Sequence, residues 1–310
     1  MSVNRTGFNL IKSLFSFTTL LFAALMVLVF IPGKRESESP FVFVAVSSAI
    51  WLVFIWLNSR NGTRQHIKDI TYGIFILLII WELSTRVLNL LTQALFPTPE
   101  SVFQVFINDY KLMWTGLFSS LYLLFVGFSI ALILGNLLGL FVGWNDRLRK
   151  DFYPIAKVLC PIPPTIYTPY LIAILPTFGS ASIAVVAFGL FWPTFMTMIN
   201  LVGSMDRRII DSAKAMGVGT PAMLLKVILP YQIPGIISGF RVMFSATFMV
   251  LVMAEMIGAQ SGLGFFIKKF SDYADYTRVA AGIIFIGIVI TVLNVLITLV
   301  EKKCVKWKTN

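Results

Sequence analysis

Apolar stretches of about twenty residues recur along the whole chain. A helix of about 20 residues crosses a bilayer core about 30 Å thick, and it bonds its own backbone while doing so. Hydrophobic residues make up 57% of the 310 residues and charged residues 13%, against about 25% charged in a soluble domain. This composition excludes a disordered chain, a basic nucleic-acid-binding domain and an ordinary soluble enzyme. It predicts a polytopic membrane protein.

We expect an all-α fold, a transmembrane bundle with eight spans. The first apolar run, 13–31, exceeds the apolar part of a signal peptide and lacks a small-residue cleavage pattern, so a retained anchor helix is expected. The eight spans are predicted at residues 11–31, 40–57, 70–96, 114–143, 152–176, 180–203, 234–260 and 280–301.

The Lys and Arg residues predict the orientation. The formal charge is +11, and cytoplasmic loops of membrane proteins carry an excess of Lys and Arg. Most of these residues outside the spans fall in segments that are cytoplasmic if both termini are cytoplasmic. We therefore expect the N-terminus and the C-terminus on the cytoplasmic side.

The longest polar interruption on that side runs from Gly203 to about Pro230, and its residues 206–230 have the pattern of a helix–turn–helix. Asp206 can cap the first helix, and Gly217 can close it in the left-handed conformation. Thr220 can cap a second helix with Pro221 in its first position, and Leu229-Pro230 would end that helix. Read from the residues alone, the segment is either a docking element or a connector resting on lipid headgroups.

The segment resembles the EAA loop of ABC importer permeases. That family's pattern is Glu-Ala-Ala, three residues, Gly, nine residues, Ile, one residue and Leu-Pro. The chain has Asp211-Ser-Ala213, Gly217 and Val227-Ile-Leu229-Pro230 at the same spacing. It departs from the family's pattern in having Asp for Glu, Ser for one Ala and Val for Ile. Further segments resemble the nitrate/sulfonate/taurine-type branch: Gly127-Phe128, Gly135–Gly139, Pro161–Pro164, Pro234–Arg241 and Ala254–Gly264.

The resemblance implies a type I importer fold and a permease subunit in the bacterial inner membrane. It implies two copies of an ATP-binding subunit, a second permease chain that we expect to be identical, and an extracytoplasmic solute-binding protein. The implied substrate is a small solute such as a sulfonate, nitrate or a related organic compound. Carried over by position, the loop that couples to the ATPase comprises Asp211, Ala213, Gly217, Leu229 and Pro230.

The resemblance does not cover the first two spans. We expect residues 1–60 to form two additional N-terminal helices, whose role the sequence leaves open. Residues 67–310 would form a six-helix importer domain that carries the coupling loop at 206–230.

Residues for chemistry are scarce. The chain has one histidine, His66, and two cysteines, so we expect neither a metal site nor a His-based triad. A phosphate-binding Gly-x-x-x-x-Gly-Lys-Ser/Thr loop is missing from the sequence. We expect a transport subunit that is not an enzyme, binds no cofactor itself, and relies on ATP held by its partner.

Two places are candidates for the translocation path or its gate. Five prolines interrupt 161–176, and irregular backbone at membrane depth must be buried in protein or line a cavity. Thr165, Tyr167, Thr168 and Tyr170 follow the first of these prolines, and the alternative is a kink needed only for packing. Glu255 lies in an apolar run. It is either a residue of the path or gate, or a residue whose structural hydrogen bond holds the turn 258–264.

Two packing features are also predicted. Gly135, Gly139 and Gly143 form a ridge of small residues, which favours close helix packing within the chain over a dimer contact. Glu82 and Arg86 are four residues apart and should neutralise each other on one helix face.

Two other function classes stay open at this point. An ion-coupled secondary transporter or channel would need no ATPase partner. An integral-membrane enzyme would need a cluster of His, Asp or Glu at one depth, which the sole histidine and the isolated Glu255 argue against.

Overall fold

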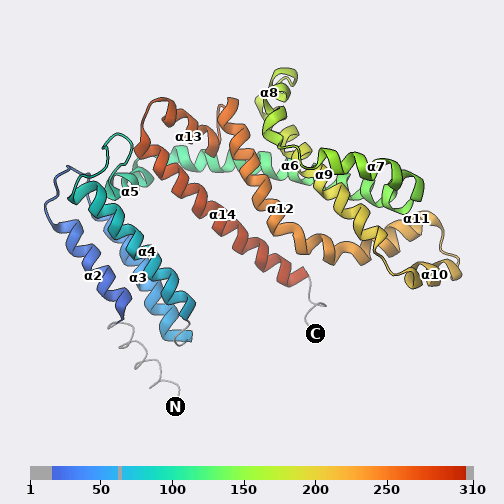
Figure 1. Ribbon diagram of the computed structural model, residues 1–310, viewed down its shortest axis with the longest axis horizontal. Coiled ribbons are helices and arrows are strands. Elements are labelled where there is room, and N and C mark those ends of the chain that lie inside the picture. The colour runs from blue at the N-terminus through green and yellow to red at the C-terminus, as the bar shows by residue number, and fades with distance from the viewer. Residues whose placement is uncertain (1–15, 62–64, 305–310) are drawn as a thin grey trace, which may run out of the picture. The chain divides into compact units, whose positions relative to one another are not determined.

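The computed structural model describes residues 16–61 and 65–304, and it is helical without a β-strand over these ranges (Figure 1). The all-α prediction is therefore confirmed. The chain divides into two compact units. The first comprises Met1–Lys111 with Lys269–Ile283, and the second Leu112–Lys268 with Ile284–Asn310.

The first unit packs its helices around a small apolar core. Its helices α2, α3 and α4 lie side by side (Figure 1), and α5 contacts α3 and α4. The core contains Leu25, Val29, Phe43, Phe75 and Leu78. The elements are α2 (Phe17–Phe30), α3 (Phe41–Asn61), α4 (Gln65–Glu82), the π-helical η1 (Leu83–Val87) and α5 (Pro99–Asn108). Residues 11–15 of the first predicted span lie outside the described residues.

The third predicted span, 70–96, is too long, because the helix ends at Val87. Asn89 has a left-handed backbone with φ of 53°. The buried Arg35 donates hydrogen bonds to the side chain of Asn89 and to the carbonyl oxygens of Leu91 (2.5 Å) and Phe96 (2.7 Å). These bonds replace the helical bonds that residues 88–96 would otherwise make, so the chain can leave the helix at this point.

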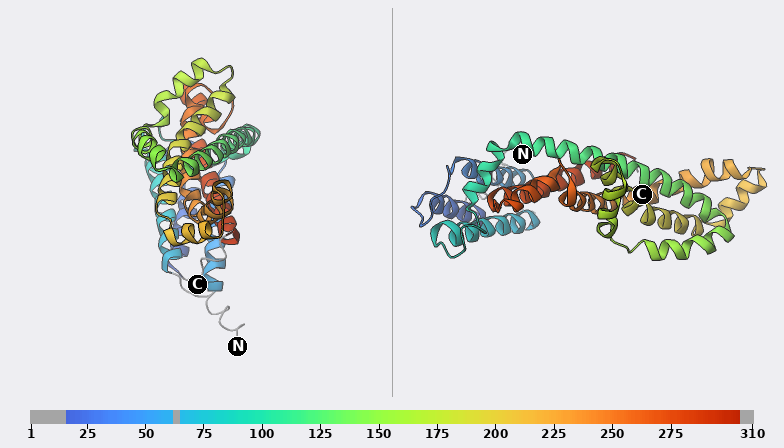
Figure 2. Two further views of the ribbon diagram at one scale, coloured as in Figure 1. Left: turned by 90° about the vertical axis from the view of Figure 1, so that its right-hand side faces the viewer. Right: turned by 90° about the horizontal axis from the view of Figure 1, so that it is seen from above.

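The second unit has a core built by four long helices. Buried side chains of α6, α9, α12 and the later part of α14 meet in it, among them Leu124, Val186, Phe248 and Val289. Helix α9 contacts α7, α8 and α12, as can be followed in Figure 2. The elements are α6 (Tyr110–Trp144), α7 (Asp146–Leu159), α8 (Pro164–Ile174), α9 (Phe178–Gly203), α10 (Arg207–Ala215), α11 (Thr220–Ala222), the π-helical η2 (Met223–Ile228), α12 (Leu229–Gly258), α13 (Leu263–Asp272) and α14 (Tyr276–Cys304), of which α6, α13 and α14 extend into the first unit.

The fifth predicted span, 152–176, is wrong as a single helix. Helix α7 ends at Leu159 and α8 begins at Pro164. Pro161 and Pro163 stand in the gap, where their missing N–H groups and fixed φ do not permit a continuous helix. Neither α7 nor α8 is long enough to cross a bilayer alone.

Seven segments of the described ranges are long and apolar enough to cross a membrane. They are Phe41–Asn58, Gln65–Val87, Tyr110–Trp144, Phe178–Gly203, Thr220–Ile237, Gly239–Gly258 and Tyr276–Glu301. Two of them, 220–237 and 239–258, belong to one uninterrupted run of helix that starts at Thr220.

The predicted end of a helix at Leu229-Pro230 is therefore wrong. Inside an α-helix, a proline ring clashes with the carbonyl group four residues earlier. Here the π-helical turn η2 ends at Ile228, two residues before Pro230. Its wider ring is closed by the N–H of Leu229, which bonds to the carbonyl oxygen of Leu224. This wider turn accommodates the proline and lets the helix continue.

The glycine ridge of α6 packs on α9 within the chain, as predicted. A Cβ atom added at Gly139 would lie 2.8 Å from the Cβ atom of Met198 and 2.8 Å from the carbonyl oxygen of Phe195. Gly135 and Gly143 face α9 in the same way, as does Gly127. Hydrophobic burial supplies little force between helices in lipid, so this close approach makes van der Waals packing the attraction between α6 and α9.

We expect Gly139→Leu to destabilise the chain by about 1–3 kcal/mol, because the added side chain must push α9 away. Thermal unfolding of the purified protein in detergent measures the effect. Gly73→Leu is the matched control, since nothing lies within 4 Å of a Cβ atom at Gly73 on α4. Equal unfolding midpoints for the two variants would contradict the packing described.

Candidate functional site

The segment that follows α9 forms a short helix with one packed and one open face. The Asp206 side chain accepts a hydrogen bond from the N–H of Arg208 (2.9 Å) and caps α10, as predicted. Ala213 is 3% exposed, and Ile209 and Ile210 pack beside it on the cluster of Met198, Met223 and Ile228. This apolar face is therefore not available to a partner, because α10 uses it to attach to α9 and η2.

Gly217 closes α10 in the left-handed conformation, with φ of +75°. The N–H of Val218 bonds to the carbonyl oxygen of Ala213 (3.2 Å), and the N–H of Gly217 bonds to that of Lys214 (2.9 Å). These two bonds make a Schellman motif, whose left-handed position favours glycine. The predicted role of Gly217 as the closing residue of this helix is confirmed.

The second helix begins one residue earlier than predicted. Gly219 is the cap residue and Thr220 the first helical residue, with Pro221 in the next position. The Thr220 side chain therefore does not cap this helix. From here the chain runs through α11 and η2 into α12 without interruption, so only residues 216–219 separate α10 from this continuous helix.

The open face of α10 is polar. Arg208, Asp211 and Lys214 are exposed, and Met216 is an isolated apolar side chain that is 76% exposed. The Lys214 ammonium lies 5.7 Å from the centre of the Trp144 ring, which ties this face to the end of α6. A cavity of about 260 Å³ adjoins it, with Asp211, Lys214, Arg207 and Arg149 among its lining residues.

Glu255 is buried at 1% exposure, and both its carboxyl oxygens are bonded. Ser120 on α6 donates to Oε1 (2.6 Å), and the N–H of Gly264 donates to Oε2 (2.8 Å). The Ser120 hydroxyl also accepts from the N–H of Leu263 (2.9 Å). Gly262 has φ of +124°, and a Cβ atom there would overlap the Glu255 carboxyl group. This geometry supports the structural interpretation of Glu255, as the group that holds the turn before α13.

The polar residues of α8 do not converge. Thr168 is buried, and its hydroxyl bonds to the carbonyl oxygen of Pro164 (2.9 Å). Tyr170 is 69% exposed, and the Tyr167 ring packs on Phe188 of α9. Thr165 is half-buried at the start of the helix. The four side chains therefore point to different surroundings, and their role in a translocation path stays a prediction.

Sequence reasoning missed two partners of buried charges. Ser120 lies 135 residues from Glu255, and Glu100 lies 14 residues from Arg86, with which it forms an ion pair (3.4 Å). A serine in an apolar helix and a glutamate after a proline carry no local pattern that would single them out. Only the fold brings them to their partners.

Comparisons with known proteins agree with the fold and with the family resemblance. The family model of binding-protein-dependent transport system inner membrane components matches residues 131–306, more than half of the chain. A permease protein assigned to aliphatic sulfonate transport in Bacillus subtilis, SsuC, is 26% identical over 76% of this chain and 86% of its own length. The taurine transport system permease TauC of Escherichia coli is 25% identical over 79% of this chain and 91% of its own length.

A solved structure shows the same fold. A chain of the methionine ABC transporter MetNI, in an inward-facing form, matches with a TM-score of 0.55 at 20% identity. The match covers 66% of this chain and 99% of that chain. It establishes the type I importer permease fold. This chain is thus a multi-pass membrane protein and a transport permease subunit of an ABC importer, and it belongs to the family of binding-protein-dependent transport system inner membrane components.

Proposed function

We propose that α10 and the turn at Gly217 form the element by which an ATP-binding subunit moves this permease. The observation that carries the proposal is the division of α10 into two faces. The inner face, with Ala213, is packed on α9 and η2, while Asp211 and its charged neighbours remain exposed. A helix attached in this way transmits a displacement at its open face to the helices beneath it.

The assembly we propose contains two copies of this chain, two ATP-binding subunits and an extracytoplasmic solute-binding protein. ATP would be bound and hydrolysed on the partner subunits, since the sequence lacks the phosphate-binding loop. Family membership supports the two kinds of partner. The proposed orientation, with both termini cytoplasmic, places α10 on the side where ATP is available.

In the proposed cycle, ATP binding draws the two docking helices together. The continuous helix from Thr220 to Gly258 connects this docking region directly to the core of the second unit. Because the turn at Gly217 is closed by two backbone hydrogen bonds, α10 and this long helix should move as one body. Their tilt would open the path alternately to the two sides of the membrane.

The proposed substrate is a small anion, a sulfonate or nitrate, or a related organic compound. Support comes from relatives whose names give aliphatic sulfonates and taurine, and from the nitrate import permease NrtB of Leptolyngbya laminosa, 27% identical over 74% of this chain and 85% of its own length. A role for Thr165, Tyr167, Thr168 and Tyr170 in the path remains part of this proposal.

We expect Gly217→Val to reduce ATP-driven uptake at least tenfold while the protein still accumulates in the membrane. A β-branched residue in the left-handed conformation costs about 1–2 kcal/mol, which disfavours the closed turn. Co-purification of the ATP-binding subunit and uptake are the measurements. Gly219→Val is the matched control, because Gly219 has equally open surroundings but an ordinary φ of −69°. Unchanged uptake and subunit retention in Gly217→Val would refute the docking assignment.

We expect Ser120→Ala to lower stability by about 1–3 kcal/mol, because it leaves the N–H of Leu263 and one Glu255 oxygen without a partner. Thermal unfolding and the KM for uptake are measured together. A structural role for Glu255 predicts a lower midpoint with an unchanged KM in both Ser120→Ala and Glu255→Gln. A changed KM at an unchanged midpoint would instead assign Glu255 to the path.

Uptake of radiolabelled taurine, an alkanesulfonate and nitrate tests the function as a whole. Cells that express this chain with its ATP-binding and solute-binding partners should accumulate one of the three compounds. An ATP-binding subunit without its phosphate-loop lysine should abolish the accumulation. Uptake that persists in this control would indicate a secondary transporter or channel.

A further inference from the structure

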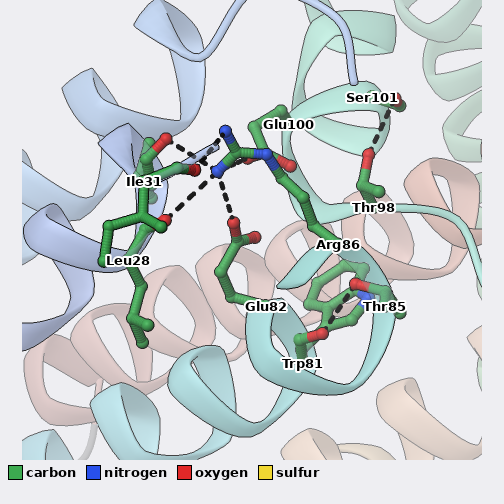
Figure 3. Close-up of polar contacts among 10 residues, drawn as sticks. Leu28, Ile31, Trp81, Glu82, Thr85, Arg86, Thr98, Glu100 and Ser101 are labelled. Carbon is green, nitrogen blue, oxygen red and sulfur yellow. Dashed lines mark hydrogen bonds and ion pairs between the residues drawn. The ribbon is translucent and has the colours of Figure 1, made fainter. Parts of the chain in front are cut away.

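Three charged side chains meet inside the first unit (Figure 3). Glu82 ends α4, Arg86 lies in η1, and Glu100 lies in the first turn of α5. The Nη1 atom of Arg86 is 2.9 Å from Oε1 of Glu82 and 3.4 Å from Oε1 of Glu100. Both glutamate residues are 0% exposed. The sequence predicts the Glu82–Arg86 pair, and the fold adds a second acid to the same guanidinium.

Arg86 also binds the end of α2. Its Nη1 atom donates to the carbonyl oxygens of Leu28 (3.3 Å) and Val29 (2.7 Å), and its Nη2 atom donates to that of Ile31 (3.2 Å). Figure 3 shows Leu28 and Ile31 beside the Arg86 guanidinium. The last carbonyl groups of a helix have no partner within the helix, and a cation is favourable there. Arg86 therefore serves as the C-terminal cap of α2.

The chain that follows α2 is folded closely around Arg86. The N–H groups of Lys34 and Arg35 both donate to the carbonyl oxygen of Arg86, at 3.1 and 3.3 Å. A Cβ atom at Gly33 would lie 2.8 Å from both Cγ and the carbonyl oxygen of Arg86. The cluster thus joins α2, η1 and α5. Of these elements, α2 is one of the two helices that precede the importer domain.

The hydrogen bonds of Arg86 leave one acid without a donor. The Nη1 atom carries two hydrogens but has four acceptors around it, of which the oxygens of Val29 and Glu82 are the nearest. The Nη2 atom donates to Ile31, and in the described part of the chain neither its second hydrogen nor the Nε hydrogen bonds to Glu82 or Glu100. Both carboxyl oxygens of Glu100 and Oε2 of Glu82 are buried and have no hydrogen-bond partner in the part of the chain that the structure describes.

Counting charges gives the same result. Two ionised carboxylates and one guanidinium would leave a net negative charge in a buried site, which is strongly unfavourable. The N-terminus of α5 offers Glu100 only about half an elementary charge in compensation. The other titratable groups of this unit either have partners of their own or lie away from the cluster. Arg35 bonds to Asn89, Leu91 and Phe96, and Arg278 pairs with Asp109 and Asp275. Lys34 is exposed, and residues 66–72 of α4 lie at least ten residues before Glu82.

We propose that the Glu82–Glu100 pair binds one proton, which makes the cluster with Arg86 electrically neutral and stabilises the joint between α2, η1 and α5. A proton held between the two carboxyl groups supplies the missing donor. It lets one acid donate to the free oxygen of the other, while the remaining negative charge pairs with Arg86. The cluster is then a proton-binding site that fastens α2 to the chain leading into α6.

Infrared spectroscopy of the purified full-length protein in nanodiscs tests this proposal directly. A carboxylic acid and a carboxylate have well-separated C=O stretching bands. At neutral pH, the wild type should show a carboxylic-acid band that shifts in heavy water and disappears in both Glu82→Gln and Glu100→Gln, because the remaining acid then ionises opposite Arg86. Glu36→Gln, which removes an exposed acid of the same unit, should leave the band intact.

Thermal unfolding of the same variants gives a second, independent result. Either single variant should keep its midpoint within about 2 °C of the wild type, because the charge balance with Arg86 is maintained. The double variant leaves a buried cation unpaired and should lose roughly 6 °C or more.

A wild type without the carboxylic-acid band overturns the proposal, and so does a band that both single variants retain. A midpoint that rises in each single variant would mean that both acids are ionised in the wild type. A midpoint that depends on sodium concentration would mean that a metal cation takes the place of the proton. If a variant fails to accumulate, solid-state NMR of the wild type replaces it. The two carboxyl groups are assigned through their contact with Arg86, and their carbon chemical shifts distinguish an acid from a carboxylate.

Discussion

Backbone polar groups inside a membrane must find their hydrogen bonds within the protein, because lipid offers none. Helices meet this requirement along most of the chain, and charged side chains meet it where the chain leaves a helix. Arg35 bonds the carbonyl groups of 91 and 96 where the third span ends early, and Arg86 bonds the last carbonyl groups of α2. Glu255 does the converse, since its carboxylate accepts the N–H of Gly264. Arg35, Arg86 and Glu255 therefore act as partners of the backbone.

The same solvent determines how the helices associate. Lipid tails are as apolar as leucine, so burial of apolar surface contributes little and close contact must supply the attraction. The glycines of α6 allow α9 to approach until a single added Cβ atom would overlap it. A buried charge, by contrast, must be balanced exactly where it lies. Arg86 illustrates this, because one cation serves two acids and three carbonyl groups within a single site.

The proposed docking segment, α10 with the turn at Gly217, is attached to the rest of the second unit in two ways. Its apolar side is packed on α9 and η2, and its turn is closed by backbone hydrogen bonds around Gly217. Little of α10 can move without the helices beneath it, whereas its charged side is available to a partner. This combination suits the proposed function, in which the energy for transport reaches the helices of the permease through a contact with an ATP-binding subunit.

Local patterns in the sequence were sufficient for the helical class, most spans, the cap at Asp206 and the left-handed closure at Gly217. Each of these depends on neighbouring residues only: apolar length, a capping side chain or a glycine. The tertiary structure decided three other features. They are the continuation of the helix through Pro230, the burial of Ala213, and the pairing of Ser120 and Glu100 with their partners. These features arise where segments distant in the sequence compete for the same hydrogen bonds, charges and space, and neither periodicity nor residue type records which segments will meet.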